Sequence, residues 1–353
     1  MNISALSRTG VAVALSAILA SFFTPAQADT TGSPLFPSLS LTPGIRDRMF
    51  MRFGYIHANI QTKSGDARDV GLPVVRYGDI VNYAANDPSL SNARRNQFIT
   101  AGNALDDAME SLGLNGLGAP PGVKARADDS AGTPAISLGY YFTDDLSWVV
   151  EAYLLAVPLK SDVYGDGVNV SGNPNGLNGH HIISTKILPP TAMLGYYFGS
   201  KQSRFRPYLG VAAMYAIFFD TEATQFLNAY QGGASPGDTS VSVKNKFGFG
   251  PAAGFKYSFG EDWHVSMNVA QVNLKTEATL TTRHTTITSA SPVTRDYDPL
   301  IVGAIDVGDT TAIMKSLAKM RDGRANGDLG TYVRKQSTTL NNTLFMLSIG
   351  RSF

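Results

Sequence analysis

The chain has 353 residues, of which 43% are hydrophobic and 16% are charged. Charged residues usually make up roughly a quarter of a soluble domain, so this composition is unusual for a soluble protein. The sequence contains no cysteine, which excludes a disulfide-stapled scaffold, a cysteine-ligated metal centre and a thiol enzyme. The 29 basic residues are balanced by 28 acidic ones, which leaves no positive excess to bind the backbone of a nucleic acid.

The first 28 residues contain the three parts of a secretory signal peptide. Arg8 supplies a short positive region, Val11 to Phe23 is almost entirely apolar, and Ala26-Gln27-Ala28 is a small-residue cleavage site. The alternative, a permanent anchor helix, is disfavoured because the apolar run is short and is followed by Pro25. We therefore predict that residues 1–28 are a cleaved export signal.

The segment 247–259 alternates without interruption between apolar residues and small or polar ones. A period of two indicates a β-strand whose two faces meet different environments. The apolar face carries aromatic residues at both ends, Phe247 and Phe249 at one end and Tyr257 and Phe259 at the other, as expected for lipid contact between two aromatic girdles. Strands of soluble sandwiches are usually shorter, at roughly five or six residues.

The same alternation recurs along the chain and predicts eight strands in all. In the seventh of these, the phase weakens at residues 271–274, which indicates either a β-bulge or emergence from the membrane. The predicted strands occupy residues 50–60, 134–142, 147–157, 188–198, 205–220, 242–259, 263–279 and 339–353.

The connections between these strands alternate strictly between short and long. This layout is typical of an all-β, eight-stranded antiparallel transmembrane β-barrel of the outer-membrane type, with short periplasmic turns and long external loops. A closed barrel also satisfies every backbone hydrogen bond within lipid, which favours it over a soluble sandwich. We predict a periplasmic N-terminal segment at 29–49 and an outer-membrane barrel at 50–353. The predicted external loops are 61–133, 158–187, 221–241 and 280–338.

The two largest loops contain further patterns. Ser91 to Leu112 and Thr311 to Met320 have the spacing of short amphipathic helices. The pair His180-His181 lacks a third ligand at useful spacing, so we expect no metal site there and no cofactor.

Six segments carry a resemblance to a known family: Gly139 to Leu146, Leu188 to Thr191, Phe205 to Val211, Tyr215 to Asp220, Gly250 to Gly254 and Met346 to Phe353. Together they resemble the OmpW family, which includes the AlkL-type proteins. The resemblance covers the strands, something under half of the chain, and implies an outer-membrane barrel for passive uptake of small hydrophobic molecules. Phe353 resembles the terminal residue that the outer-membrane assembly machinery recognises in most such barrels. Two departures are the long loops 61–133 and 280–338, and Arg351 at a place where such barrels often have an aromatic residue.

The face predicted to point into the barrel is mostly apolar or amphipathic. An eight-stranded barrel has room for side chains or one slim ligand, so a general water pore is excluded. Few charges are predicted inside: Glu151, Arg206 and Lys256. We predict that a solute path is lined by inward residues, and the alternative is that these same residues pack a solid core. They are Tyr141, Tyr153, Leu155, Met193, Met214, Phe218 and Met346.

Three functions are therefore considered. The first is a channel for small hydrophobic solutes, and the second is a structural or surface-interaction barrel whose loops contact lipopolysaccharide, phage or host material. The third, a barrel enzyme, is disfavoured because neither His57 nor His284 has an acid or nucleophile that the sequence places beside it. The expected partners are outer-membrane lipid, lipopolysaccharide, hydrophobic solutes and the assembly machinery.

Overall fold

The computed structural model describes residues 48–353, except 261, 288–290, 307–314 and 320–326. The chain divides into two units, and the second of them, Met49–Phe353, contains the elements described below. The predicted signal peptide at 1–28 and the segment 29–49 as far as residue 47 lie outside the described residues. Half of the helix predicted at 311–320 also lies outside them, and residues 315–319 are described as helix.

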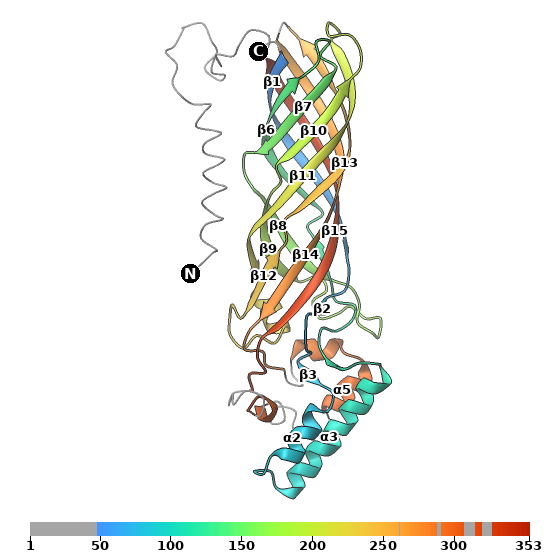
Figure 1. Ribbon diagram of the computed structural model, residues 1–353, viewed down its shortest axis with the longest axis vertical. Helices are drawn as coiled ribbons and strands as arrows, with labels where there is room; N and C mark the ends of the chain where they lie inside the picture. Colours follow the sequence, from blue (N-terminus) through green and yellow to red (C-terminus); the bar gives the residue numbers. More distant parts are fainter. Residues whose placement is uncertain (1–47, 261, 288–290, 307–314, 320–326) are drawn as a thin grey trace, which may run out of the picture. The chain divides into compact units, whose positions relative to one another are not determined.

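Eight strands form a closed antiparallel ring, in which β1 pairs with β15 and β10 with β11, so that no edge is left open (Figure 1). The predicted fold class, an eight-stranded antiparallel barrel, is confirmed. In spatial order from β1 the ring consists of β1 (Met49–Ser64), β6 (Ser130–Tyr141), β7 (Trp148–Leu155), β10 (Thr191–Tyr197), β11 (Phe205–Ala223), β13 (Lys246–Phe259), β14 (Trp263–Thr282) and β15 (Tyr332–Ser352).

Short turns join ring strands at one end of the barrel, the turn end, and long connections lie at the other, the loop end (Figure 1). The long connections carry secondary structure of their own. It consists of β2 (Arg68–Asp69), β3 (Val75–Arg76), α2 (Asp79–Asn86), α3 (Asn92–Ser111), β4 (Gly116–Leu117), β5 (Lys124–Ala127), β8 (Leu159–Asp166), β9 (His181–Leu188), α4 (Gln225–Tyr230), β12 (Thr239–Val243), the 3-10 helix η2 (Pro292–Asp296) and α5 (Pro299–Asp306).

Several strands run farther into the predicted loops than expected. β14 has 20 residues and β15 has 21, whereas about 9–11 tilted residues cross a bilayer. The predicted loop 158–187 contains β8 and most of β9. They continue the sheet beyond the ring, because β9 pairs with β11 and β8 pairs with β9. Outside lipid the outward face of a strand no longer needs to be apolar, so hydropathy alternation loses the signal that marks the membrane-spanning part.

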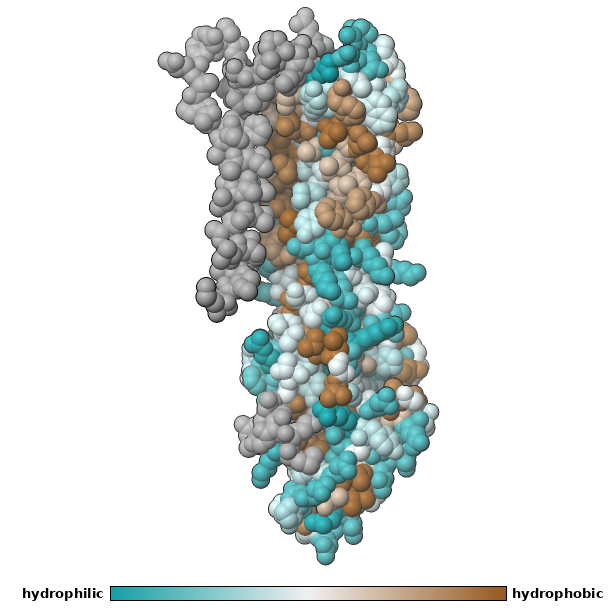
Figure 2. Space-filling view, viewed as in Figure 1, coloured by the Kyte–Doolittle hydropathy of each residue, from teal (hydrophilic) through white to brown (hydrophobic). Residues whose placement is uncertain are grey.

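The alternation that predicted the strands reflects the two environments of the barrel wall. Outward side chains such as Leu209, Val211 and Leu347 are 58%, 58% and 63% exposed, whereas the inward Tyr208 and Ala212 beside them are buried. Figure 2 shows an apolar band on the surface of the ring, bordered by hydrophilic residues towards the loop end. This band is the surface that contacts lipid.

The seventh strand contains no bulge at residues 271–274. β14 keeps one register with β15 from Trp263 to Thr282, and its outward Gln271, Asn273 and Lys275 follow the apolar Met267 in phase. The weak hydropathy signal therefore marks emergence from the membrane, one of the two predicted alternatives, and the bulge alternative was wrong.

Aromatic residues border the apolar band at both ends. Near the turn end, Trp148 contacts Tyr196 with ring centroids 5.2 Å apart and stacks on Phe142 at 6.2 Å. Towards the loop end, Tyr215 and Phe247 lie 4.5 Å apart. Such amphipathic rings are favoured at the two membrane interfaces.

The helices at the loop end surround a second hydrophobic core, separate from the lumen. The predicted helix at 91–112 is confirmed as α3, which begins after Ser91, whose hydroxyl accepts a hydrogen bond from the amide of Arg94 at 3.3 Å. Phe98, Leu105 and Met109 of α3 are buried in this core. Among the described residues, no helix combines the length and the apolar character that crossing a membrane requires.

Candidate functional site

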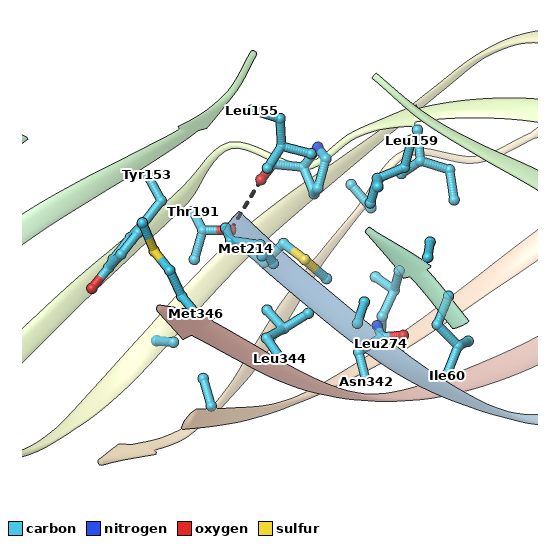
Figure 3. A pocket seen from close by; sticks show the side chains of 18 of the residues that line it. Ile60, Tyr153, Leu155, Leu159, Thr191, Met214, Leu274, Asn342, Leu344 and Met346 are labelled. Carbon is cyan, nitrogen blue, oxygen red and sulfur yellow. Dashed lines mark hydrogen bonds between the residues drawn. The ribbon is translucent and has the colours of Figure 1, made fainter. Parts of the chain in front are cut away.

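An apolar cavity of about 100 Å³ lies inside the ring (Figure 3). All eight ring strands contribute to its wall, and β5, β8 and β9 complete it towards the loop end. Most of the wall is aliphatic or thioether side chain, a surface that favours small hydrophobic molecules over ions. The wall includes Ile56, Ala58, Leu155, Met193, Met214, Phe218, Leu344 and Met346.

Polar side chains at the cavity wall are few, and three of them, Tyr153, Thr191 and Asn268, are hydrogen-bonded. Asn268 donates a hydrogen bond to the hydroxyl of Tyr153 at 3.0 Å, and this hydroxyl contacts the sulfur of Met193 at 3.8 Å. The hydroxyl of Thr191 donates to the carbonyl oxygen of Pro189 at 3.0 Å, which is the dashed line in Figure 3. These three side chains already have partners, whereas the hydroxyl of Tyr208 has none among the described residues. The cavity therefore offers few free polar groups to a solute.

A buried ion pair crosses the lumen on the turn-end side of the cavity. Both terminal nitrogens of Arg52 are bonded: Nη1 donates to the two carboxylate oxygens of Glu151 at 2.9 and 2.7 Å, and Nη2 donates to the hydroxyl of Tyr197 at 3.0 Å. Its Nε donates to Nε2 of His264 at 3.1 Å, and the hydroxyl of Ser137 donates to Glu151. These residues come from five different strands. Arg52 holds both Glu151 of β7 and His264 of β14, which lie on opposite sides of the ring, so the cluster ties these walls together.

Aromatic rings fill the space around this ion pair. Phe50, Tyr141 and Tyr197 follow one another with centroids 5.3 and 5.6 Å apart, and the guanidinium of Arg52 lies 4.1 Å from the centroid of Phe50. We call this cluster the plug, and it closes the lumen at the turn end. The plug consists of Phe50, Arg52, Ser137, Tyr141, Glu151, Tyr197 and His264.

Two glycines make room for the plug. Arg52 and His264 both lie opposite Gly350 in the sheet, where an added Cβ would lie 2.6 Å from Cγ of Arg52 and 2.7 Å from Nε2 of His264. Gly139 lies under the ring of Phe50, with 2.0 Å between an added Cβ and the nearest ring carbon. A side chain at either position would displace the plug, so both positions require glycine.

The barrel wall is interrupted at the level of the cavity. The ladder of β7 with β10 stops at the pair Tyr153 and Thr191, and the ladder of β8 with β9 starts at Leu159 and Ile187. The residues between include Pro189-Pro190, which have no N–H group to donate. The wall beside the cavity is therefore held by fewer hydrogen bonds than the rest of the ring.

The structure places the seven residues of the predicted solute path in two different regions. Tyr141 lies in the plug and not at the cavity. The other six line the cavity, and the role of all seven in transport stays a prediction. These six are Tyr153, Leu155, Met193, Met214, Phe218 and Met346.

Arg52, the central member of the plug, is absent from the charges predicted to lie in the lumen. Arg52 and His264 are inward residues of predicted strands, yet only Glu151, Arg206 and Lys256 were counted as lumen charges. Continuing the alternation of the first strand onto its inward face would have found Arg52, because it shares a face with Phe50 and Gly54.

The histidines considered for other chemistry lie outside the lumen. His57 faces outward on β1, and His180 stacks on Phe226 with centroids 4.1 Å apart. His284 pairs with Asp238 at 2.9 Å, and this imidazole holds the pKa of the Asp238 carboxyl below its usual value. The described residues place no serine, threonine or lysine side chain in hydrogen-bond contact with His284, and they contain no group of three or more residues suited to hold a metal ion.

The closed ring, the apolar band and the two girdles define the protein as an outer-membrane β-barrel. The model of the OmpW family matches residues 99–310, and the chain belongs to this family. It is 34% identical over 145 residues to outer membrane protein W of Vibrio cholerae, a match that covers 41% of this chain but only 59% of that relative. It is 29% identical over 181 residues to outer membrane protein W of Escherichia coli, covering 51% of this chain and 74% of the relative.

Among solved structures, the chain is similar to the outer membrane protein OprG from Pseudomonas aeruginosa and to the outer membrane protein AlkL in lipid bilayers. The first has 17% sequence identity and a TM-score of 0.49, with 87% of this chain and 96% of that chain covered. The second has 14% identity and a TM-score of 0.38, with 90% and 95% covered. As an outer-membrane protein, the chain lies among lipid and lipopolysaccharide.

Proposed function

We propose that the protein is a channel for passive uptake of small hydrophobic molecules across the outer membrane. The observation that carries this proposal is the apolar cavity inside the ring, with its lining of methionine, leucine and alanine side chains. A barrel that serves only as an anchor needs no such space, because side chains fill an eight-stranded interior. The resemblance of the strands to the OmpW family supports the same function.

The route that a solute takes out of the cavity is part of the proposal. The plug, in which Arg52 and Glu151 are fully buried, blocks the route towards the turn end. The turn end is the periplasmic end in the predicted topology. The interrupted wall around Pro189-Pro190 offers a sideways path instead, and Val157 beside it is 58% exposed on the outer surface. Hydrophobic solutes would then enter the lipid directly, which avoids their transfer into water.

The test is uptake of a small apolar solute into proteoliposomes. Met214→Asp is expected to reduce the uptake rate at least about tenfold, because a carboxylate in an apolar cavity brings its hydration shell into the path or costs several kcal/mol to desolvate. Gln202→Asp, at an exposed turn, adds the same charge outside the cavity and should leave uptake unchanged. Equal uptake by the Met214→Asp barrel and the unchanged barrel would reject a path through the cavity.

The second candidate function, surface interaction through the loops, is favoured by the helical core at the loop end. Loops without a role in contact do not need the buried cluster of Phe98, Leu105, Met109 and their partners. If this function holds, loss of α2 and α3 abolishes attachment of lipopolysaccharide or phage while solute uptake continues. We also propose that the terminal residue, Phe353, is the signal that the outer-membrane assembly machinery recognises.

A further inference from the structure

Two cations face each other at the turn end of the lumen. Arg206 on β11 lies directly opposite Lys256 on β13 in the antiparallel register, and both side chains point inward. They are only 1% and 8% exposed. Like charges directly opposite each other in a sheet are destabilising, and burial makes the repulsion stronger because water no longer screens it.

The guanidinium of Arg206 lacks the hydrogen bonds that such a buried group requires. Its Nε, Nη1 and Nη2 are all buried without a hydrogen-bond partner in the described part of the chain. The Cζ atom of Arg206 lies 5.4 Å from the ring centroid of Tyr197, and Nζ of Lys256 lies 5.3 Å from the ring centroid of Tyr141. Contact with ring faces attracts a cation but satisfies none of its N–H donors.

The charges of this region do not balance. The buried charged residues of the ring on this side of the cavity are Arg52, Arg206, Lys256 and Glu151, three basic residues against one acidic. Both oxygens of Glu151 accept from Arg52, and no nitrogen of Arg206 donates to Glu151. Buried charges persist in proteins when they are paired and hydrogen-bonded, and the pair of cations lacks such a counterion among the described residues.

We propose that Arg206 and Lys256 bind a small oxyanion, a carboxylate or a phosphate. The planar fork of a guanidinium matches the two oxygens of such an anion, and the ammonium adds a second positive charge from the neighbouring strand. The hydroxyl of Tyr141, which is also buried without a partner among the described residues, supplies a further donor near Lys256. One anion here removes the repulsion between the two cations and satisfies Arg206.

The oxyanion has two possible sources. It is either a free anion from the aqueous side of the turn end, or the head group of an amphiphilic solute whose chain occupies the cavity. Tyr208 lies two residues from Arg206 on the same inward face and lines the cavity, so the two sites are adjacent. The anion site itself does not rest on the proposed transport function, whereas the second source does.

The test measures the unfolding midpoint of the full barrel in detergent micelles against the concentration of sodium acetate or sodium phosphate at constant ionic strength. A ligand that binds only the folded state raises this midpoint in a saturable way. Arg206→Gln should raise the apparent Kd at least about tenfold, because it removes the charge-assisted bonds. Arg204→Gln removes the same charge at an exposed position two residues away and should leave the Kd unchanged.

If Arg206→Gln fails to fold, Lys256→Met provides the second variant and should also weaken binding, by about tenfold. Absence of saturable stabilisation up to about 100 mM acetate or phosphate would overturn the proposal, as would an unchanged Kd in a folded Arg206→Gln or Lys256→Met barrel. Failure here with normal uptake of apolar solutes leaves the transport proposal standing, and the reverse result leaves the anion site standing.

Sodium octanoate identifies the source. If the carboxylate of an amphiphilic solute binds at Arg206 and Lys256 while its alkyl chain lies in the cavity, octanoate should bind at least about tenfold tighter than acetate. Met214→Asp should then remove this difference in affinity. A free anion predicts equal affinity for acetate and octanoate. Both outcomes support the site and differ only in what fills it.

Discussion

At the scale of single residues, the lumen owes its closure to Arg52 and the groups that surround it. A fully buried guanidinium is tolerated because Glu151, Tyr197 and His264 together accept from its Nη1, Nη2 and Nε. The ion pair of Arg52 with Glu151 adds little to the net stability of the barrel, since desolvation of both charges offsets much of their attraction. The clear consequence of the cluster is positional, because Arg52 holds Glu151 of β7 and His264 of β14, which lie on opposite sides of the ring.

Removal of one partner tests this arrangement. Glu151→Gln removes the counterion of Arg52 and leaves only the neutral acceptors Tyr197 and His264, so it is expected to lower the free energy of unfolding by up to about 3–5 kcal/mol. Asp262→Asn removes the partner of Arg351, a half-exposed pair at 3.4 Å, and should cost about 0–1 kcal/mol. Urea unfolding of both variants in lipid bilayers measures the two costs, and similar losses would show that the lumen pair is as solvated as the surface one.

A second test at this scale concerns Tyr230 at the loop end. Its hydroxyl donates to Asp296 at 2.6 Å, and burial, followed by the Asp296 carboxylate, raises the pKa of Tyr230 well above its usual value of 10.0. The stability linked to Tyr230 is therefore fully present below pH 10 and is lost as the pH rises above it, because the unfolded chain releases the phenol proton first. Tyr230→Phe should lower stability at pH 8 yet flatten its decline between about pH 9 and 11. Hydrogen exchange of α4 against pH gives the comparison, and an equally steep decline in both proteins would refute the assignment.

At the scale of elements, side chains from separate loops pin the loop-end structure together. Asp296 of η2 accepts from the amide of Gly176 at 2.8 Å and from Tyr230 of α4, so three of the four long connections meet at one carboxylate. The fourth connection contributes α2 and α3, which pack closely because Gly102 lets the helices approach. A Cβ at Gly102 would lie 2.8 Å from Cγ2 of Val81.

This close approach predicts the effect of a larger side chain. Gly102→Leu improves intrinsic helix propensity, yet it should destabilise the α2–α3 pair by about 1–3 kcal/mol because the helices must separate. Asn103→Leu, on the exposed side of α3, makes a similar change without the clash. Faster amide exchange in α2 and α3 is expected for the Gly102 variant only, and equal exchange in both variants would contradict close packing.

At the scale of the whole molecule, the barrel is separable from residues 77–115, the segment that carries α2 and α3 and that we call the α2–α3 excursion. β3 and β4 pair as Val75 with Leu117 and Arg76 with Gly116, so the two ends of the excursion already lie side by side. The ring closes through β1 and β15 without using residues 77–115. The barrel therefore does not need the excursion in order to close.

Replacement of residues 77–115 by a short Gly-Ser linker tests this independence. The shortened protein should still insert and show the heat-modifiable electrophoretic migration of a folded barrel, and it should take up apolar solutes at an unchanged rate if the cavity is the path. The exchange of α5 amides should increase, because α5 loses α3 as a packing partner. A barrel that no longer inserts would show that the excursion is part of the folding unit.

The eight strands of the ring could be predicted from the sequence alone. Lipid on one side and a lumen on the other impose a period of two on every membrane-spanning strand. The order of long and short connections then determined which ends lie together. Where the strands leave lipid, as in β8 and β9, this constraint disappears, and their extent was underestimated.

Only the tertiary structure decided what the lumen contains. Arg52, Glu151 and His264 come from β1, β7 and β14, and none of these strands is a neighbour of another in the ring. Whether inward side chains of such strands meet depends on the tilt and stagger of the closed barrel, and alternation within one strand carries no information about either. The physical reason is that period two reports which face a residue occupies, whereas the plug and the cavity depend on which residues lie at the same height.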